Sequence, residues 1–191
     1  MSWAPSNIFL SKCEEVIPYD TTLPVNGAPG LPGELRKCNA ELASGVMVLQ
    51  TRKLCLLQLA AGASVVKGSL LELAAGSYYI ADALAAASAT KNKCAGFVSE
   101  KINENKAADL AQGVLPTAYW VWLVVQGPVD AIADANLAVE TELVSVAASG
   151  AGRLDDTAIS TPVLANAVVA MALEAVTAGA GTSFEANAKI L

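Results

Sequence analysis

Residues 119–129, Tyr-Trp-Val-Trp-Leu-Val-Val-Gln-Gly-Pro-Val, constrain the fold of this chain more than any other stretch. They combine two tryptophans with a run of valines, and such side chains suit the half-buried surface of a β-strand. Gly127 and Pro128 then predict a turn that ends the run. The apolar residues 118–125 are too few to cross a bilayer, which takes about 20. We therefore predict a core strand of an all-β domain.

The two tryptophans of this stretch are expected to have different roles. We predict that Trp120 and Trp122 point to opposite faces of the strand, because successive side chains alternate. One would then lie in the core, and the other would lie at an interface with another subunit or with a larger assembly.

The composition predicts self-association. Hydrophobic residues make up 54% of 191 residues and the mean hydropathy is +0.46, yet no apolar run reaches the roughly 18 residues of a membrane helix. The first residues lack the basic and apolar regions of a signal peptide, so we expect none. Apolar surface in such a chain is expected to be buried against other copies, in a homo-oligomer.

Charge and residue types argue against catalysis and nucleic-acid binding. The net charge of −6 is the opposite of the basic surface that phosphate contacts require. The chain has no histidine, which removes the commonest general base and metal ligand. Asp130 with Asp134, and Asp155 with Asp156, are the only paired carboxylates of note, and neither pair predicts a shared substrate. We expect no enzyme activity, cofactor, metal site or membrane partner.

The four cysteines are expected to be free, buried thiols. They show no CxxC spacing, and without a secretion signal a disulfide framework is not predicted. The residues are Cys13, Cys38, Cys55 and Cys94.

Residues 1–35 are predicted to form an extended arm, and residues 36–191 the β-rich domain. Prolines recur too often in the arm for a helix or central strand, but a disordered tail would carry fewer apolar residues. Two interpretations stay open: the arm gains order by lying on another surface, which we favour, or it folds back on its own domain. The predicted anchors are Trp3, Ile8, Phe9, Ile17 and Tyr19, which join Trp120 and Trp122 as the candidate interface residues.

The rest of the chain indicates mainly short strands. Alternation of polar and apolar residues predicts a terminal strand over residues 183–190, and we favour a strand over residues 167–176. Residues 80–89 are alanine-rich and predict a short helix, and residues 101–110 an exposed loop or helical turn. Further strands are predicted within residues 46–49, 54–59, 65–73 and 95–100. Together these indicate a compact β-barrel or sandwich with minor helix.

The chain also shows a faint internal repeat. Residues 55–75 can be laid on residues 128–148 without a gap, and with a shift one residue larger, residues 96–100 fall on residues 170–174. The shift of about 73 residues exceeds the periods of about 20–50 that solenoids use. It suits a duplicated half-domain, although chance matching of apolar residues is the other explanation.

The order of these motifs resembles the capsid decoration (cement) proteins of tailed bacteriophages. The resemblance covers roughly residues 45–191 and lies in Lys-Gly-Ser-Leu-Leu at 67–71, Ala-Gly-Phe-Val at 95–98, Val-Val-Gln-Gly-Pro-Val at 124–129, Val-Ala-Met-Ala-Leu-Glu-Ala at 169–175 and the terminal strand. It implies a structural virion protein, made in the host cytoplasm, that binds the major capsid protein on the head exterior and bridges capsomers, commonly as a trimer. The alternatives are another phage structural module, such as a tail-tube or head-fibre base protein, and a small ligand-binding β-barrel.

Overall fold

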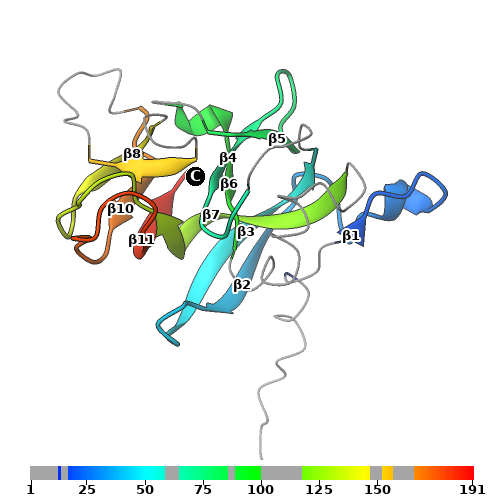
Figure 1. The fold of residues 1–191 in the computed structure, drawn as a ribbon. Helices are drawn as coiled ribbons and strands as arrows, with labels where there is room; N and C mark the ends of the chain where they lie inside the picture. Colours follow the sequence, from blue (N-terminus) through cyan, green and yellow to red (C-terminus); the bar gives the residue numbers. More distant parts are fainter. Residues whose placement is uncertain are drawn as a thin grey trace, which may run out of the picture.

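The structure is a computed structural model and describes Cys13 and residues 17–58, 65–85, 89–99, 118–146, 152–156 and 166–191. The described residues are mainly β, with two short 3-10 turns and no α-helix, as the sequence predicts for the fold class. Figure 1 shows the long strand β7 passing between two groups of strands. The strands are β1 (Ile17–Pro18), β2 (Leu35–Glu41), β3 (Met47–Leu57), β4 (Leu70–Leu73), β5 (Ile80–Leu84), β6 (Cys94–Phe97), β7 (Tyr119–Ile132), β8 (Glu142–Val146), β9 (Arg153–Asp155), β10 (Ala170–Ala172) and β11 (Ser183–Lys189), and the turns are η3 (Pro24–Gly27) and η4 (Lys91–Lys93).

A first ring of strands forms a small barrel. Its order is β3-β5-β4-β6-β7, and β7 pairs with β3 to close it. All its pairings are antiparallel except β3 with β5, which run parallel through Leu56 and Ile80. Its interior is a cluster of buried apolar side chains, among them Leu71, Val121 and Leu123. The ring is therefore filled by its own side chains.

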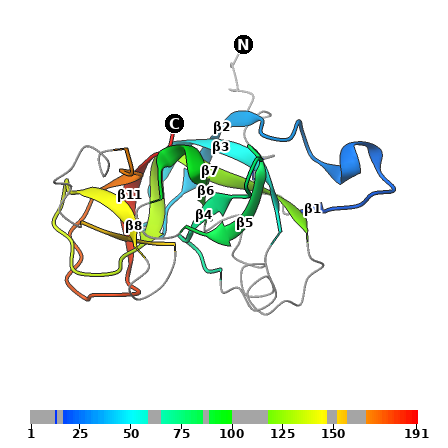
Figure 2. The same cartoon turned by 90° about the horizontal axis from the view of Figure 1, so that it is seen from above.

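A second ring uses the other half of β7. Here β7 pairs with β11, β11 with β10, β10 with β8 and β8 with β9, all antiparallel. A parallel bridge between Ala133 and Leu154 links β9 back to the end of β7. The interior is rich in alanine and valine with Phe184, because small side chains suit so tight a ring. Figure 2 shows the two groups side by side, with β7 belonging to both.

The second ring repeats the pairing order of the first. Each strand of the first ring has a counterpart in the second: β3 corresponds to β7, β4 to β8, β5 to β9, β6 to β10 and β7 to β11. The parallel pairing of β3 with β5 corresponds to the parallel bridge between the end of β7 and β9. The pair Leu70 and Phe97 in the first ring corresponds to Leu143 and Ala170 in the second, and both residues shift by 73 positions. The sequence register matches Leu70 with Leu143 in the same way, but it places Phe97 one residue further on, at Met171. The shared pairing order and the Leu70 match support an internal duplication over chance matching.

Strand β7 does not end at the Gly-Pro pair, so the predicted turn there is wrong. Gly127 has a φ of 99°, and a Cβ atom on it would lie 2.6 Å from the carbonyl oxygen of Leu49. Pro128 offers no N–H, but its carbonyl oxygen accepts a hydrogen bond of 2.6 Å from Gln50 Nε2. The pairing of β7 with β3 ends at Gln126, and pairing with β11 runs from there to Ile132. Gly127 therefore marks the change of partner between the two rings.

Of the other predicted elements, two strands are confirmed and one helix is not. The terminal strand and the strand near residue 171 are confirmed as β11 and β10. The helix predicted over residues 80–89 is wrong for its first half, because Ile80–Leu84 form β5. Pairing with both β3 and β4 outweighs the helix propensity of alanine in that segment. The loop or helical turn expected over residues 101–110 lies outside the described residues.

The prediction for the two tryptophans is also wrong. Trp120 and Trp122 are both buried, with 2% and 0% exposure, and they belong to the same apolar cluster together with Leu54 and Leu56. The physical reason is the strand period of two: adjacent residues alternate, so residues two apart share a face. Both indoles lie in one cluster, which is separate from the clusters inside the two rings. Cys13, Ile17 and Tyr19 from the beginning of the chain also belong to the tryptophan cluster.

Candidate docking surface

The described part of the N-terminal arm packs against its own chain. β1 pairs with β7 through Ile17 opposite Trp120, and the Tyr19 amide donates to the Ala118 carbonyl oxygen at 3.2 Å. The rings of Tyr19 and Tyr79 lie 6.3 and 6.2 Å from the Trp120 ring. Of the two interpretations of the arm, folding back on its own domain is therefore the one seen for these residues.

A disulfide fixes the arm to strand β2. It joins Cys13 and Cys38, whose Cα atoms are 6.4 Å apart, so the prediction of four free cysteines is wrong. The buried guanidinium of Arg52 donates to the Cys13 carbonyl oxygen at 2.9 Å. Spacing along the chain does not report distance in the fold, which is why the sequence did not reveal this pair. Cys55 and Cys94 are free and buried, as predicted.

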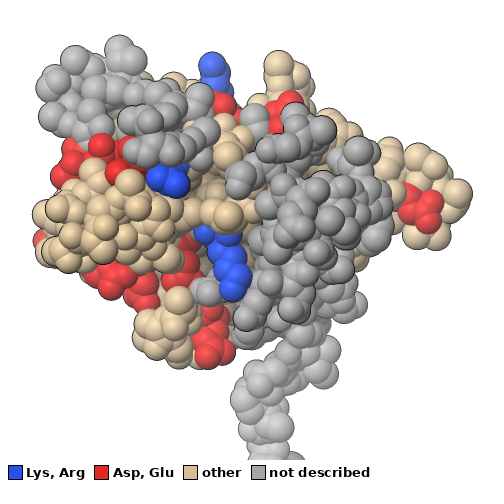
Figure 3. Space-filling view, viewed as in Figure 1, with Lys and Arg blue, Asp and Glu red and all other residues tan. Residues whose placement is uncertain are grey.

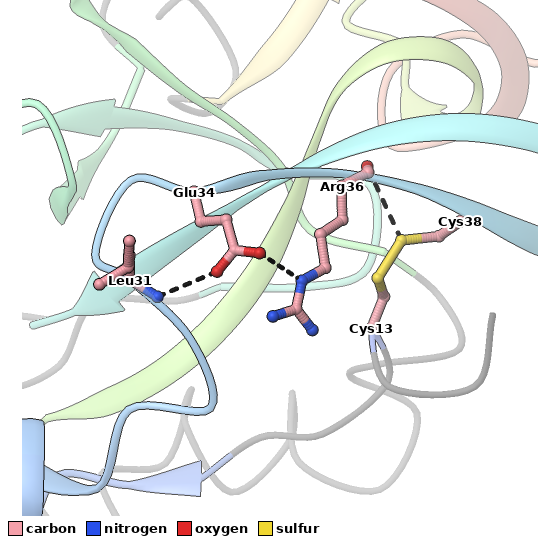
Figure 4. Close-up of polar contacts among 5 residues, drawn as sticks. All are labelled: Cys13, Leu31, Glu34, Arg36 and Cys38. Carbon is pink, nitrogen blue, oxygen red and sulfur yellow. Dashed lines mark hydrogen bonds and ion pairs between the residues drawn. A yellow bond between two sulfur atoms is a disulfide. The ribbon is translucent and has the colours of Figure 1, made fainter. Parts of the chain in front are cut away.

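A polar network ties the end of the arm to the start of β2 (Figure 4). Arg36 Nε donates to Glu34 Oε1 at 2.6 Å, and the Leu31 amide donates to Glu34 Oε2 at 3.0 Å. The Arg36 guanidinium carbon lies 4.7 Å from the centre of the Trp122 ring, a cation–π contact. The hydrogen bond from Arg36 holds the pKa of Glu34 below its usual value. The start of β2 is therefore tied both to the arm and to the tryptophan cluster.

Two of the predicted interface residues are buried inside the chain, and two more pack against the same cluster. Trp120 and Trp122 lie in the interior of the chain, and Ile17 and Tyr19 are half-buried against the same cluster. Within the chain these four residues hold the arm against its own domain, and a role for them at an interface stays a prediction. The predicted anchors Trp3, Ile8 and Phe9 lie outside the described residues.

Among the described residues, two projections carry most of the exposed large apolar side chains. The first, the arm lobe, consists of residues 19–35 with Tyr78, which lies against Gly33. The second, the hairpin tip, is the turn between β2 and β3 and its flanking residues 42–49. Figure 1 shows both extending away from the two rings, the arm lobe at the right and the hairpin at the lower left. The exposed residues are Leu23, Val25, Leu31, Leu35 and Tyr78 on the arm lobe and Val46, Met47 and Leu49 on the hairpin tip.

Both projections have a defined internal structure. On the hairpin, β2 and β3 pair from Leu35 opposite Lys53 to Glu41 opposite Met47, and one face of β2 is exposed while Cys38 and Ala40 on the other are buried. Near the tip, the Ala43 amide donates to the Asp130 carboxylate at 3.2 Å. The sequence showed a strand at residues 46–49 but gave no sign of which side chains would be exposed.

The described residues show little that resembles a reaction centre. They contain no group of three or more His, Cys, Asp or Glu side chains placed to hold a metal ion. Within the same residues, no helix has the length and apolar character to cross a membrane. Comparisons with protein-family models, with curated proteins and with solved structures give no match to this chain.

Proposed function

We propose that this protein is a structural virion protein that binds the outer surface of a phage head and stabilises the capsid by bridging capsomers. One observation carries the proposal. Of the twelve large apolar residues that are exposed within the described part of the chain, five lie on the arm lobe and three on the hairpin tip. Concentration of apolar surface on projections is typical of surfaces that dock onto another protein.

The energetics favour docking through both projections at once. Fully burying one such side chain contributes about 1.5–3 kcal/mol, whereas association costs about 4–15 kcal/mol in lost motion. The three side chains of the hairpin tip scarcely offset that cost alone. A protein that engages neighbouring capsomers with both projections gains the second contact at a high effective concentration. This arithmetic supports a bridging role.

The disulfide and the Glu34–Arg36 network favour the same role. They hold the arm lobe in one arrangement before it meets a partner, and such preorganisation lowers the entropy lost on binding. The partners in this proposal are the major capsid protein and further copies of the chain in a homotrimer, on the head exterior and after synthesis in the host cytoplasm. The proposed role uses no cofactor, and the acidic charge suits the outer shell better than the DNA-facing interior.

Co-sedimentation with undecorated, expanded heads tests the proposal. The test variant is Val46→Ser/Met47→Ser/Leu49→Ser, and the matched control is Val139→Ser/Leu173→Ser, which removes exposed apolar side chains elsewhere. We expect wild-type protein and control to reach the same occupancy and the hairpin variant to need a clearly higher concentration. No binding by wild-type protein, or equal binding by all three, would contradict the proposal.

A further inference from the structure

A groove opens where the strands separate beyond Gly127. On one side lie Leu49 and Gln50 of β3 with Lys37 of β2, and on the other lie residues of β11 that continue the pairing with β7. Its volume is about 550 Å³, within the range of about 300–1,000 Å³ that ligand sites occupy. The groove therefore lies at the junction of the two rings and next to the hairpin tip.

Three lysines from three separate elements line this groove. They are Lys37 of β2, Lys91 of η4 and Lys189 of β11. Among the described residues that line it, no Asp or Glu is present. No described carboxylate forms an ion pair with any of the three lysines; Lys189 Nζ lies 3.8 Å from the Met171 sulfur.

The surroundings make this positive groove unusual. Residues 127–191 contain eight acidic and two basic residues, against ten of each in residues 1–126, so the net charge of −6 belongs to the second ring and its loops. Figure 3 shows most red atoms of that face around the second ring at the left, with a short blue strip beside them near the centre. An anionic ligand is attracted to the lysines in the groove and repelled by the acidic surface around it, so it can bind only along the groove.

The other lining groups indicate what kind of anion fits. The amides of Gln126 and Asn187 offer donors and acceptors that suit a peptide backbone. A second hollow of about 400 Å³ shares Lys91 and adds Asn92 and Asn166, which extends the amide-rich surface. The described residues that line the two hollows include no aromatic side chain, so they offer none of the stacking platform that single-stranded nucleic acid uses. An acidic peptide matches these groups better than a polynucleotide.

We propose that this groove binds an acidic peptide segment of a partner protein. Lys37, Lys91 and Lys189 pair with its carboxylates, and Gln126 and Asn187 hydrogen-bond its backbone. Leu49 and Leu191, both largely exposed at the groove, contact its aliphatic side chains. The inference goes beyond the proposed function, since it holds for any partner that presents such a segment.

Fluorescence anisotropy with a labelled peptide of alternating Glu and Ala measures this binding directly. Lys91→Ala is compared with Lys93→Ala, because both residues lie on η4 and only Lys91 lines the groove. We expect Lys91→Ala to weaken binding about twofold to fivefold, as loss of one exposed ion pair does, and Lys37→Ala/Lys189→Ala to weaken it further. Lys93→Ala should leave it unchanged. Raising the salt from about 0.02 to 0.2 M should weaken wild-type binding through screening.

Carbodiimide cross-linking of the same peptide to wild-type protein, followed by mass spectrometry, locates the site without any substitution. We expect peptide adducts on Lys37, Lys91 and Lys189. Adducts spread evenly over Lys53, Lys67 and Lys93 as well, equal loss of binding in Lys91→Ala and Lys93→Ala, or tighter binding of an oligothymidylate than of the peptide would each overturn the proposal. So would the absence of measurable binding at low salt.

Discussion

The indole N–H of Trp120 donates a hydrogen bond of 3.0 Å to the carbonyl oxygen of Asn26, which is 94 residues away along the chain. Asn26 lies in the η3 turn of the arm lobe, with a φ of 53°, and Trp120 lies in β7. This contact joins the projecting arm lobe to the strand that both rings share. The position of the lobe therefore depends on the central strand.

Trp120→Phe and Trp122→Phe form a matched pair that tests this dependence. Both changes shrink a buried ring, but only Trp120 Nε1 has a hydrogen-bond acceptor among the described residues. We expect Trp120→Phe to lower the free energy of unfolding by about 1 kcal/mol more than Trp122→Phe, which is the usual net value of one hydrogen bond. Limited proteolysis should cut the arm lobe faster in Trp120→Phe only. Equal cutting in both variants would contradict a specific role for the Asn26 contact.

Thiol titration of denatured, unreduced protein should find two free groups per chain, from Cys55 and Cys94. The bridge between Cys13 and Cys38 spans 25 residues, and closing a loop of that length stabilises a fold by about 3–4 kcal/mol in the chain-entropy account. Dithiothreitol should therefore lower the melting temperature of the wild-type protein. The variant Cys38→Ser should melt lower from the start and should not respond to the reductant. A reductant effect of the same size in both proteins would show that the bridge is not its cause.

Alkaline pH should destabilise the fold through the two free cysteines. Burial raises the pKa of both Cys55 and Cys94 from 9.0 to about 12. Below pH 9 the thiols are neutral in both the folded and unfolded chains, so stability is full there. Between pH 9 and about 12 only the unfolded chain releases these protons, so each thiol lowers the unfolding free energy by about 1.4 kcal/mol per pH unit. Denaturant titrations of wild-type protein and Cys55→Ala/Cys94→Ala should show a shallower alkaline decline in the variant; parallel declines would assign the effect to other groups.

Gly127→Ala should cost far more stability than Gly45→Ala. Both glycines have positive φ, at 99° and 82°, so each substitution incurs the conformational cost of about 1 kcal/mol. Only at Gly127 would the added Cβ meet backbone, 2.6 Å from the Leu49 carbonyl oxygen, whereas nothing lies within 4 Å at Gly45. The clash must move β3 or β7 and should add at least about 1–3 kcal/mol. Chemical denaturation of the two variants checks this, and similar losses would mean that the strands separate easily at this point.

How much of the fold the sequence predicts depends on the range of the interactions involved. The strand at Trp120 and the terminal strand around Phe184 follow from local composition and alternation, and they appear in the structure. The shift of 73 residues follows from apolar spacing, and Leu70 and Leu143 indeed hold equivalent places in the two rings, opposite Phe97 and Ala170. These features need no knowledge of which segments meet in space.

The features that the sequence missed depend on contacts between distant segments. Ile80–Leu84 form a strand because β3 and β4 lie on either side, which local alanine content does not reveal. The Cys13–Cys38 bridge and the Trp120–Asn26 contact exist because the arm folds back, and proline content alone gave no reason for that direction. The wrong prediction that Trp120 and Trp122 point to opposite faces had a different origin. The strand period of two places residues two apart on the same face, so the sequence alone was enough to avoid it.

Cryo-electron microscopy of expanded heads saturated with the protein tests the central claim most directly. The proposal predicts density on the outer surface, with the arm lobe around Leu31 and the hairpin tip around Met47 touching two neighbouring capsomers. Empty outer surfaces at saturating protein, or density that contacts the shell only through the second ring while Leu31 and Met47 face solvent, would contradict it.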